Sequence, residues 1–187
     1  KPIILSTGMN SISSITKSVD IIQKHQIPYA LLHVTSLYPT PYGKVRLGAV
    51  SQLKSNFPDA VIGLSDHSIG NYTCYASIAL GASILEKHFT SDKNWPGPDI
   101  SISINQIELK DLILGSNAIF ESLGGEKTIL DDEKTTAQFA YASVVTTQEI
   151  KKGEFFTMEN IWVKRPGTGQ IRPIDFKKIM SEVKYFR

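Results

Sequence analysis

The sequence predicts an α/β protein with a mainly parallel sheet, and two repeating features support this class. Four short apolar runs rich in leucine or β-branched residues recur early in the chain, namely PIIL (2–5), YALL (29–32), AVIGL (60–64) and SIL (83–85). Such runs are typical of buried parallel strands. The segments between them carry apolar residues at helical spacing. Strands that alternate with helices form a parallel sheet joined by right-handed crossovers.

Three predicted helices show this spacing. The first places Ile15, Val19 and Ile22 on one face after a cap at Ser11 or Ser13, and the second places Val50, Leu53 and Phe57 ahead of Pro58. A third begins at an apparent capping box, Asn105 with Glu108, and has an apolar face of Leu109, Leu112, Ile113 and Phe120 before Gly124 and Gly125. Each helix therefore has one side suited to packing against the sheet.

Four strand–helix units indicate half of a (β/α)8 barrel or a small open sheet. A complete barrel needs about 250 residues, and this chain has 187. We expect the barrel-like portion to cover 1–127 and a polar linker to cover 128–140. Short alternating segments then predict a small β-rich second domain over 141–187.

Composition limits the classes of function. The chain is 41% hydrophobic, which is enough for a core, and its longest apolar runs are too short for a membrane span. The net charge is +2, with 20 basic and 18 acidic residues, so a nucleic-acid partner is not expected. The single cysteine, Cys74, excludes an intrachain disulfide framework. These features favour a soluble, cytoplasmic protein without a membrane or nucleic-acid partner.

Polar residues follow each of the four predicted strands, and parallel strands bring them to one edge. The four clusters are Ser6 and Thr7; His33, Thr35 and Ser36; Ser65, Asp66 and His67; and Glu86, Lys87 and His88. Any one hydroxyl could simply cap the next helix. Four convergent clusters instead predict a functional site at this edge.

His67 and His88 follow successive strands, so we expect their imidazoles to lie close enough to share a divalent ion such as manganese, iron, zinc or magnesium. Packed or surface histidines are the alternative, and this is the expected role of His25 in the first helix. Asp66 could be a ligand, an orienter of a histidine or a turn residue.

Three serines, Ser6, Ser36 and Ser65, supply uncharged donors for a phosphate or carboxylate, with Lys87 and Lys1 as the nearby cations. The loop over 90–100 places Asp99 among prolines and a glycine, as a substrate contact or as a turn residue.

Six motifs occur here in the order found in sialic acid synthases: ILSTGM (4–9), HVTSLYPTP (33–41), GLSDHS (63–68), ALGASILEKHFT (79–90), PGPDISIS (96–103) and VKRPGTG (163–169). The chain resembles the bacterial N-acetylneuraminate synthase type over essentially its whole length. The resemblance implies a TIM barrel, represented here by its C-terminal half, followed by part of an antifreeze-like (SAF) domain.

The resemblance also implies an activity. Members of this family are transferases that condense phosphoenolpyruvate with an N-acylated hexosamine, here N-acetylmannosamine, to give N-acetylneuraminate and phosphate by C–O cleavage. It makes His67 and His88 the ligands of Mn²⁺ or Mg²⁺. It places Ser6, Ser36 and Ser65 at the phosphoenolpyruvate, although asparagine stands at the position of Ser36 in some relatives.

Further positions match the sugar site of this family. The resemblance gives sugar contacts to Tyr38 and Asp99, with Phe139 as a weaker candidate. It identifies Arg165 with an arginine that one subunit inserts into its partner's barrel, which implies a domain-swapped homodimer. Glu86 is a candidate base for the attacking water, and a salt bridge with a lysine is its alternative role.

The resemblance implies that the chain begins at the fifth barrel strand of its relatives and stops within the antifreeze-like domain. We therefore expect a fragment, or the ordered part of a longer chain, that is neither stable nor active as a monomer alone. Three other functions stay open. They are a legionaminic or pseudaminic acid synthase, a carbohydrate-binding module on an incomplete barrel, and, with less support, a metal-dependent hydrolase.

Overall fold

The computed structural model describes residues 1–182. The chain divides into two compact units, Lys1–Gly124 and Gly125 onward.

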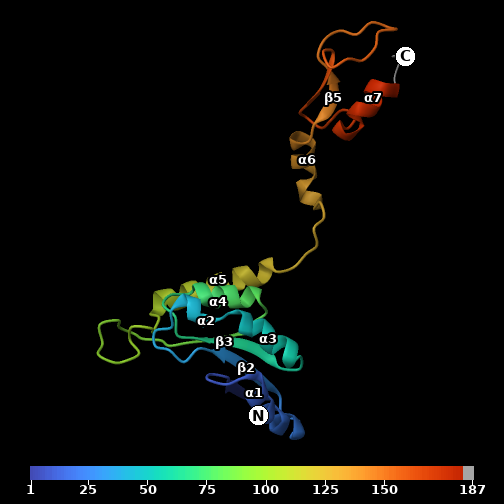
Figure 1. The fold of residues 1–187 in the computed structure, drawn as a ribbon. Coiled ribbons are helices and arrows are strands. Elements are labelled where there is room, and N and C mark those ends of the chain that lie inside the picture. The colour runs from blue at the N-terminus through green and yellow to red at the C-terminus, as the bar shows by residue number, and fades with distance from the viewer. Residues whose placement is uncertain (183–187) are drawn as a thin grey trace. The chain divides into compact units, whose positions relative to one another are not determined.

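A parallel sheet of four strands forms the centre of the first unit (Figure 1). The strands lie in the order β1 (Ile3–Ser6), β2 (Tyr29–Val34), β3 (Val61–Asp66) and β4 (Ile84–Lys87), and every neighbouring pair is parallel. All four predicted strands are confirmed. Each extends one or two residues further toward its carboxyl end than expected, so part of the polar clusters lies in the strands themselves.

Helices follow each of the four strands, as the alternation predicts. They are α1 (Ile12–Lys24), α2 (Tyr42–Val45), α3 (Gly48–Asn56), α4 (Tyr72–Ala79) and α5 (Gln106–Ser122). The Ser11 hydroxyl accepts a hydrogen bond from the Ser14 amide at the start of α1. Asn105 and Glu108 form the predicted capping box of α5. Both predicted helix starts are therefore confirmed.

The core of the first unit lies between the sheet and these helices. One cluster packs α1 and α3 against β2 and β3, and it includes Val19, Leu31, Val50 and Leu53, each at most 2% exposed. Burial of such side chains stabilises the fold by about 1.5–3 kcal/mol each. The predicted apolar faces of α1 and α3 are those that the structure buries.

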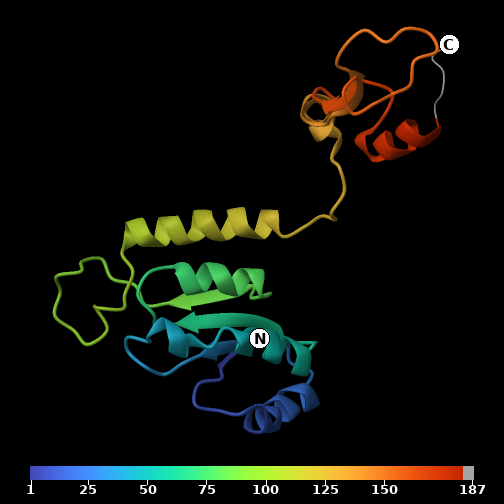
Figure 2. The same ribbon diagram turned by 45° about the horizontal axis from the view of Figure 1, so that its top comes forward.

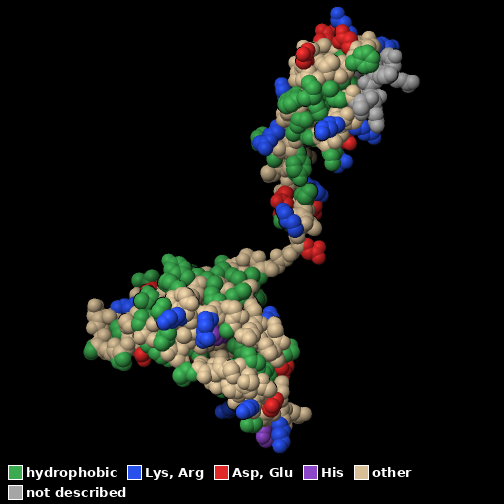
Figure 3. All heavy atoms as spheres, viewed as in Figure 1, with side chains coloured by type: hydrophobic (Ala, Val, Ile, Leu, Met, Phe, Trp, Pro, Cys, Tyr) green, Lys and Arg blue, Asp and Glu red, His purple; other side chains and the backbone are tan. Residues whose placement is uncertain are grey.

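The last helix of the first unit, α5, differs from the expectation. Figure 2 shows α5 beside α4, and Leu112 packs there in a second cluster with Leu64, Cys74 and Ile104. The other residues of the predicted face stay partly or largely exposed: Leu109, Ile113 and Phe120 at 36%, 53% and 71%. The space-filling view shows hydrophobic side chains gathered over this helix (Figure 3).

The second unit is small and contains both strands and helices. Strands β5 (Ser143–Thr146) and β6 (Ile161–Lys164) pair antiparallel. The other elements are η1 (Asp131–Glu133), α6 (Lys134–Ala140), η2 (Pro173–Asp175) and α7 (Phe176–Glu182). Helix α6 lies within the predicted linker, and α7 was not predicted. Residues 183–187 of the predicted second domain lie outside the described residues.

Across residues 1–182, no helix combines the length and the apolar character that a membrane crossing requires.

Candidate active site at the carboxyl edge of the sheet

The carboxyl ends of β3 and β4 bring the main candidate residues together. In the register of this pair, Ser65 lies opposite Glu86 and Asp66 lies opposite Lys87. Side chains alternate between the two faces of a sheet. Ser65 and Glu86 therefore share one face, and Asp66 and Lys87 share the other.

His67 and His88 follow these strands and lie close together, as the sequence predicts. Their ring centroids are 5.3 Å apart, with an interplanar angle of 67°. Tyr38 stacks on His67 at 4.1 Å and meets His88 edge-on at 6.0 Å. His67 is 7% exposed, whereas the side chain of His88 is 34% exposed. The three rings form a small aromatic group at the edge of the sheet.

The two histidines are oriented through their Nδ1 atoms. His67 Nδ1 lies 3.2 Å from the carbonyl oxygen of Thr35, and a carbonyl can only accept, so this contact assigns the proton to Nδ1. His88 Nδ1 lies 3.7 Å from Asp99 Oδ2, an electrostatic contact longer than a direct hydrogen bond. Within residues 1–182, neither Nε2 atom has a hydrogen-bond partner. Both rings thus keep one nitrogen open for a ligand.

The loop after β2 places Tyr38 beside His67. The Tyr38–Pro39 peptide bond is cis, and the Thr40 amide donates to the carbonyl of His67 at 3.0 Å. The Thr40 hydroxyl donates to the carbonyl of Leu37 at 2.7 Å. These contacts tie the loop to the end of β3, so the tyrosine ring is held against the imidazole.

Glu86 accepts a hydrogen bond of 2.7 Å from the Ser65 hydroxyl. Its expected alternative role was a salt bridge with a lysine, and across the described residues no lysine pairs with it. Glu86 is exposed, so its second oxygen is accessible to water or substrate. This geometry leaves the carboxylate available for proton transfer.

Asp66 belongs to a buried network instead of contacting a histidine. Its carboxylate accepts from Lys87 Nζ at 2.7 Å, from the Ser68 amide at 3.0 Å and from the Thr73 hydroxyl at 2.8 Å. Burial by itself raises the pKa of this carboxyl, but the hydrogen bond and charge of Lys87, with the other donors, lower it overall. Asp66 is therefore an ionised residue of the turn, one of its three expected roles.

The two lysines that were expected near the site, Lys87 and Lys1, do not lie there. Lys87 is committed to Asp66, with a side chain only 2% exposed. Lys1 precedes β1 and so lies toward the opposite, amino edge of the sheet. The expectation that these two lysines are the cations near the site is therefore wrong. Lys87 points to the other face of the sheet, which its position next to a strand end does not reveal, and Lys1 lies at the other end of its strand.

The remaining candidates are placed as follows. Ser6 is exposed at the end of β1, and the Ser36 hydroxyl lies close to Gly8, where an added Cβ would come within 2.7 Å of it. Asp99 contacts His88 as described. Phe139 lies on α6 and Arg165 follows β6, so both belong to the second unit.

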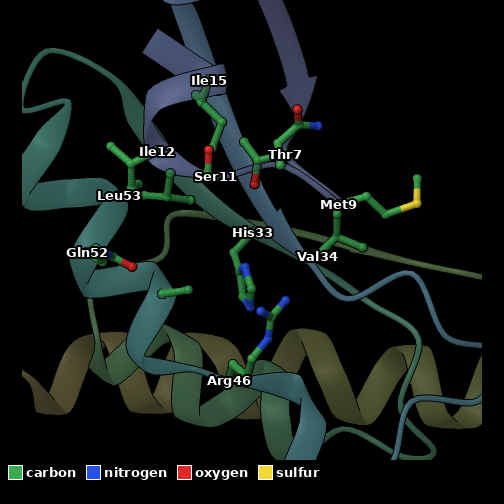
Figure 4. Close-up of a pocket in the computed structure, with 12 residues that line it drawn as sticks. Thr7, Met9, Ser11, Ile12, Ile15, His33, Val34, Arg46, Gln52 and Leu53 are labelled. Carbon is green, nitrogen blue, oxygen red and sulfur yellow. The ribbon is translucent and has the colours of Figure 1, made fainter.

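A pocket of about 450 Å³ lies elsewhere at this edge, between the start of α1 and α3 (Figure 4). Figure 4 shows Arg46 and His33 pointing toward each other on one side of it and Thr7 on another. His33 Nε2 contacts the carbonyl of Val45 at 2.7 Å, and burial lowers the pKa of its imidazole. The pocket does not include His67 or His88, and it is separate from the histidine site.

The two open Nε2 atoms of His67 and His88 are compatible with a divalent ion that has few protein ligands. Two imidazoles whose Nδ1 atoms face acceptors are a common arrangement for metal-binding histidines. In the part of the chain that the structure describes, no group of three or more His, Cys, Asp or Glu residues is placed to hold a metal. Any ion held here by His67 and His88 would keep positions open for water and substrate.

A sheet of four consecutive parallel strands with polar residues at its carboxyl edge is consistent with part of a β/α barrel. Residues 1–128 match the NeuB family. The chain therefore belongs to the NeuB family, a family of sialic acid synthase type, as the motifs predict.

Several known proteins are similar to it. An uncharacterized protein of Methanocaldococcus jannaschii is 42% identical, over 90% of this chain and 50% of its own length. The N,N'-diacetyllegionaminic acid synthase of Campylobacter jejuni is 39% identical, over 98% of this chain and 55% of its own length. The crystal structure of a sialic acid synthetase from Leptospira borgpetersenii aligns with a TM-score of 0.66 at 37% identity. The alignment covers 71% of this chain and 47% of that one. The chain spans about half the length of the curated relatives it matches.

Two relatives of lower identity are named for other sugar-acid products. The human N-acetylneuraminate-9-phosphate synthase is 33% identical, over 88% of this chain and 46% of its own length. The Campylobacter jejuni pseudaminic acid synthase is 32% identical, over 97% of this chain and 53% of its own length.

Sequence reasoning missed two groups at the site. The carbonyl of Thr35 orients His67, and no sequence pattern marks a main-chain contact of this kind. The Asp66–Lys87 pair was also missed, although a signal existed, because each charged residue directly precedes a candidate histidine at the end of a neighbouring strand.

Proposed function

We propose that this protein catalyses the metal-dependent condensation of phosphoenolpyruvate with an N-acylated hexosamine, to give a sialic-acid-type sugar acid and phosphate. The observation that carries the proposal is the pair of imidazoles at the carboxyl edge of the sheet, each with Nδ1 facing an acceptor and Nε2 open. Membership of the NeuB family supports the same reaction.

His67 and His88 would hold Mn²⁺ or Mg²⁺ through their Nε2 atoms. When bound, such an ion acts as a Lewis acid on the aldehyde oxygen of the open-chain sugar. Tyr38, stacked on His67, would cover one side of the pair and limit the access of water. Asp99 would meet a sugar hydroxyl close to His88.

The reaction needs one new carbon–carbon bond and one water. The enol carbon of phosphoenolpyruvate attacks the aldehyde carbon, the aldehyde oxygen takes up a proton from solvent to become a hydroxyl, and an oxocarbenium centre is left at C2. Water adds to that centre, and phosphate leaves with cleavage of the C–O bond. Glu86 would take the proton from this water, and the hydrogen bond from Ser65 would orient its carboxylate. Ser6 and Ser36 would donate to the phosphate or carboxylate of phosphoenolpyruvate, and Ser65, whose one hydroxyl proton goes to Glu86, would line the same site.

Residues of the second unit enter this proposal through a partner subunit. Arg165, with Phe139, would reach the sugar site of a second copy in a domain-swapped homodimer, where the arginine would meet the acyl group. The second unit would then act as the antifreeze-like domain of the family. The proposed location is the cytoplasm, where phosphoenolpyruvate is available.

We propose N-acetylmannosamine as the sugar and N-acetylneuraminate as the product. A legionaminic or pseudaminic acid synthase is the second candidate, and the 39% identity to a legionaminic acid synthase favours it. The two candidates share the chemistry at His67, His88 and Glu86. They differ in the groups that surround the sugar.

A phosphate-release assay tests both candidates. The protein expressed from its complete gene is incubated with phosphoenolpyruvate, Mn²⁺ and, in turn, N-acetylmannosamine or the precursor hexosamines of legionaminic and pseudaminic acid. We expect phosphate release with one sugar and its loss with a chelator, while the control His25→Ala, at an exposed position directly after α1, remains active. Sugar binding without turnover or metal dependence would instead identify a carbohydrate-binding module and contradict the proposal.

A further inference from the structure

One lysine connects the two segments that carry the candidate metal ligands. Lys87 Nζ donates to Asp66 Oδ2 at 2.7 Å and to the carbonyl of Ser68 at 2.7 Å. Asp66 and Ser68 are the two residues on either side of His67. Lys87 itself directly precedes His88. A single ammonium group thus joins the residue before one histidine to the side chain of the residue before the other histidine and to the main chain of the residue after it.

All members of this connection are buried and hydrogen-bonded. The side chains of Lys87 and Asp66 are 2% and 1% exposed. The Ser68 hydroxyl donates to Asp66 at 2.9 Å and lies 2.8 Å from the hydroxyl of Thr73 on α4. Buried charges that are paired and fully hydrogen-bonded hold one geometry, since any displacement leaves a charge without a partner.

The network lies on the face of the sheet opposite to the chemistry. Asp66 and Lys87 point toward α4, where Thr73 and Cys74 contact the carboxylate. Ser65 and Glu86 alternate to the other face. Lys87 therefore has no contact with a substrate at the histidine site, and its influence must pass through the main chain.

We propose that Lys87 is a positioning residue that sets the separation of His67 and His88 for metal binding. The inference rests on the metal site of the proposed function. Metal ligands must be held within about 0.5 Å of the productive geometry, and supporting contacts provide this precision. The contacts to Asp66 and Ser68 restrain the segment of His67 from both sides, in addition to the β3–β4 pairing and the contacts of His67 with Thr35 and Thr40. Loss of the ammonium would therefore loosen the separation of the two imidazoles.

Metal titration tests this role directly. Mn²⁺ affinity is measured by calorimetry, and the visible absorption of bound Co²⁺ reports the ligand geometry. The variants are Lys87→Met and the double variant Asp66→Asn/Lys87→Met, which removes both buried charges and so limits the loss of stability. Lys93→Met is the matched control, because Lys93 pairs with Glu108 at 2.9 Å with both side chains 39% exposed and contacts neither histidine.

We expect the double variant to be folded and to bind Mn²⁺ about 10- to 100-fold more weakly, the usual effect of losing a group that supports a metal ligand. Its Co²⁺ spectrum should change, and Lys93→Met should match the wild type. Asp66→Asn alone keeps the shape of the side chain and an acceptor for Lys87, so it should weaken binding by a smaller factor, although it leaves the buried ammonium without its counter-charge. Wild-type affinity in a folded double variant would show that Lys87 only stabilises the fold and would overturn the inference. Failure of the wild-type protein to bind metal would instead overturn the proposed function.

Discussion

The ammonium of Lys87 lies 2.7 Å from the carboxylate of Asp66, across the register of two neighbouring parallel strands, with both side chains almost completely buried. This pair joins the ends of β3 and β4 directly before His67 and His88. Because the site depends on these strand ends, the stability of the pair and the geometry of the site are linked.

Breaking the pair should strongly destabilise the first unit. Lys87→Met leaves the Asp66 carboxylate buried without its cation, and we expect the free energy of unfolding to fall by about 3–5 kcal/mol. Urea denaturation measures this change. The double variant Asp66→Asn/Lys87→Met should recover most of the loss, whereas equal losses in the single and double variants would show that charge burial is not the cause.

The stability of the protein should depend on Asp66 at acidic pH. The pKa of this carboxyl is lowered in the folded state from its ordinary value of 3.8. The stabilisation is therefore complete above pH 3.8 and is lost as the pH falls below it toward the folded value. Denaturation across this range should give a shallower decline for Asp66→Asn than for the wild type. A parallel decline in both would remove Asp66 as a source of acid sensitivity.

Replacement of Glu86 should affect turnover more than binding. Glu86→Gln keeps an acceptor for the Ser65 hydroxyl but cannot take a proton from water. We expect kcat to fall about 10²- to 10⁴-fold, the usual contribution of a general base, while the affinity for Mn²⁺ is retained. A kcat close to that of the wild type would assign the proton transfer to another group.

Cys74 should be unreactive in the folded protein. Burial, followed by the nearby charge of Asp66, raises the pKa of its thiol to about 12, and the side chain is fully buried. Since the thiolate is the reactive form, we expect no labelling by a thiol reagent at pH 8 until denaturant is added. Rapid labelling under native conditions would show that α4 opens readily from the sheet.

The strands and the histidine pair could be predicted because both depend on local pattern. Apolar runs such as YALL mark buried strands, and parallel strands necessarily bring the residues that follow them to one edge. The proximity of His67 and His88 follows from that rule alone. The capping box of Asn105 and Glu108 was equally local.

Features that depend on tertiary context could not be predicted. The direction of Lys87 depends on where β4 ends, and one residue of difference moves a side chain to the other face. The predicted apolar face of α5 is mostly exposed because α4 contacts it chiefly around Leu112. Helix α6 was assigned to a linker because KTTAQFA is polar and lacks an apolar stripe.

The affinity of the protein for Mn²⁺, measured by calorimetry in the wild type and in His67→Ala, His88→Ala and His25→Ala, tests the central claim most directly. We predict that either of the first two substitutions lowers the affinity at least about 100-fold, because each removes one of two protein ligands. His25→Ala, an exposed position at the end of α1, should leave it unchanged. Equal Mn²⁺ affinity in all four proteins would contradict a metal site formed by His67 and His88.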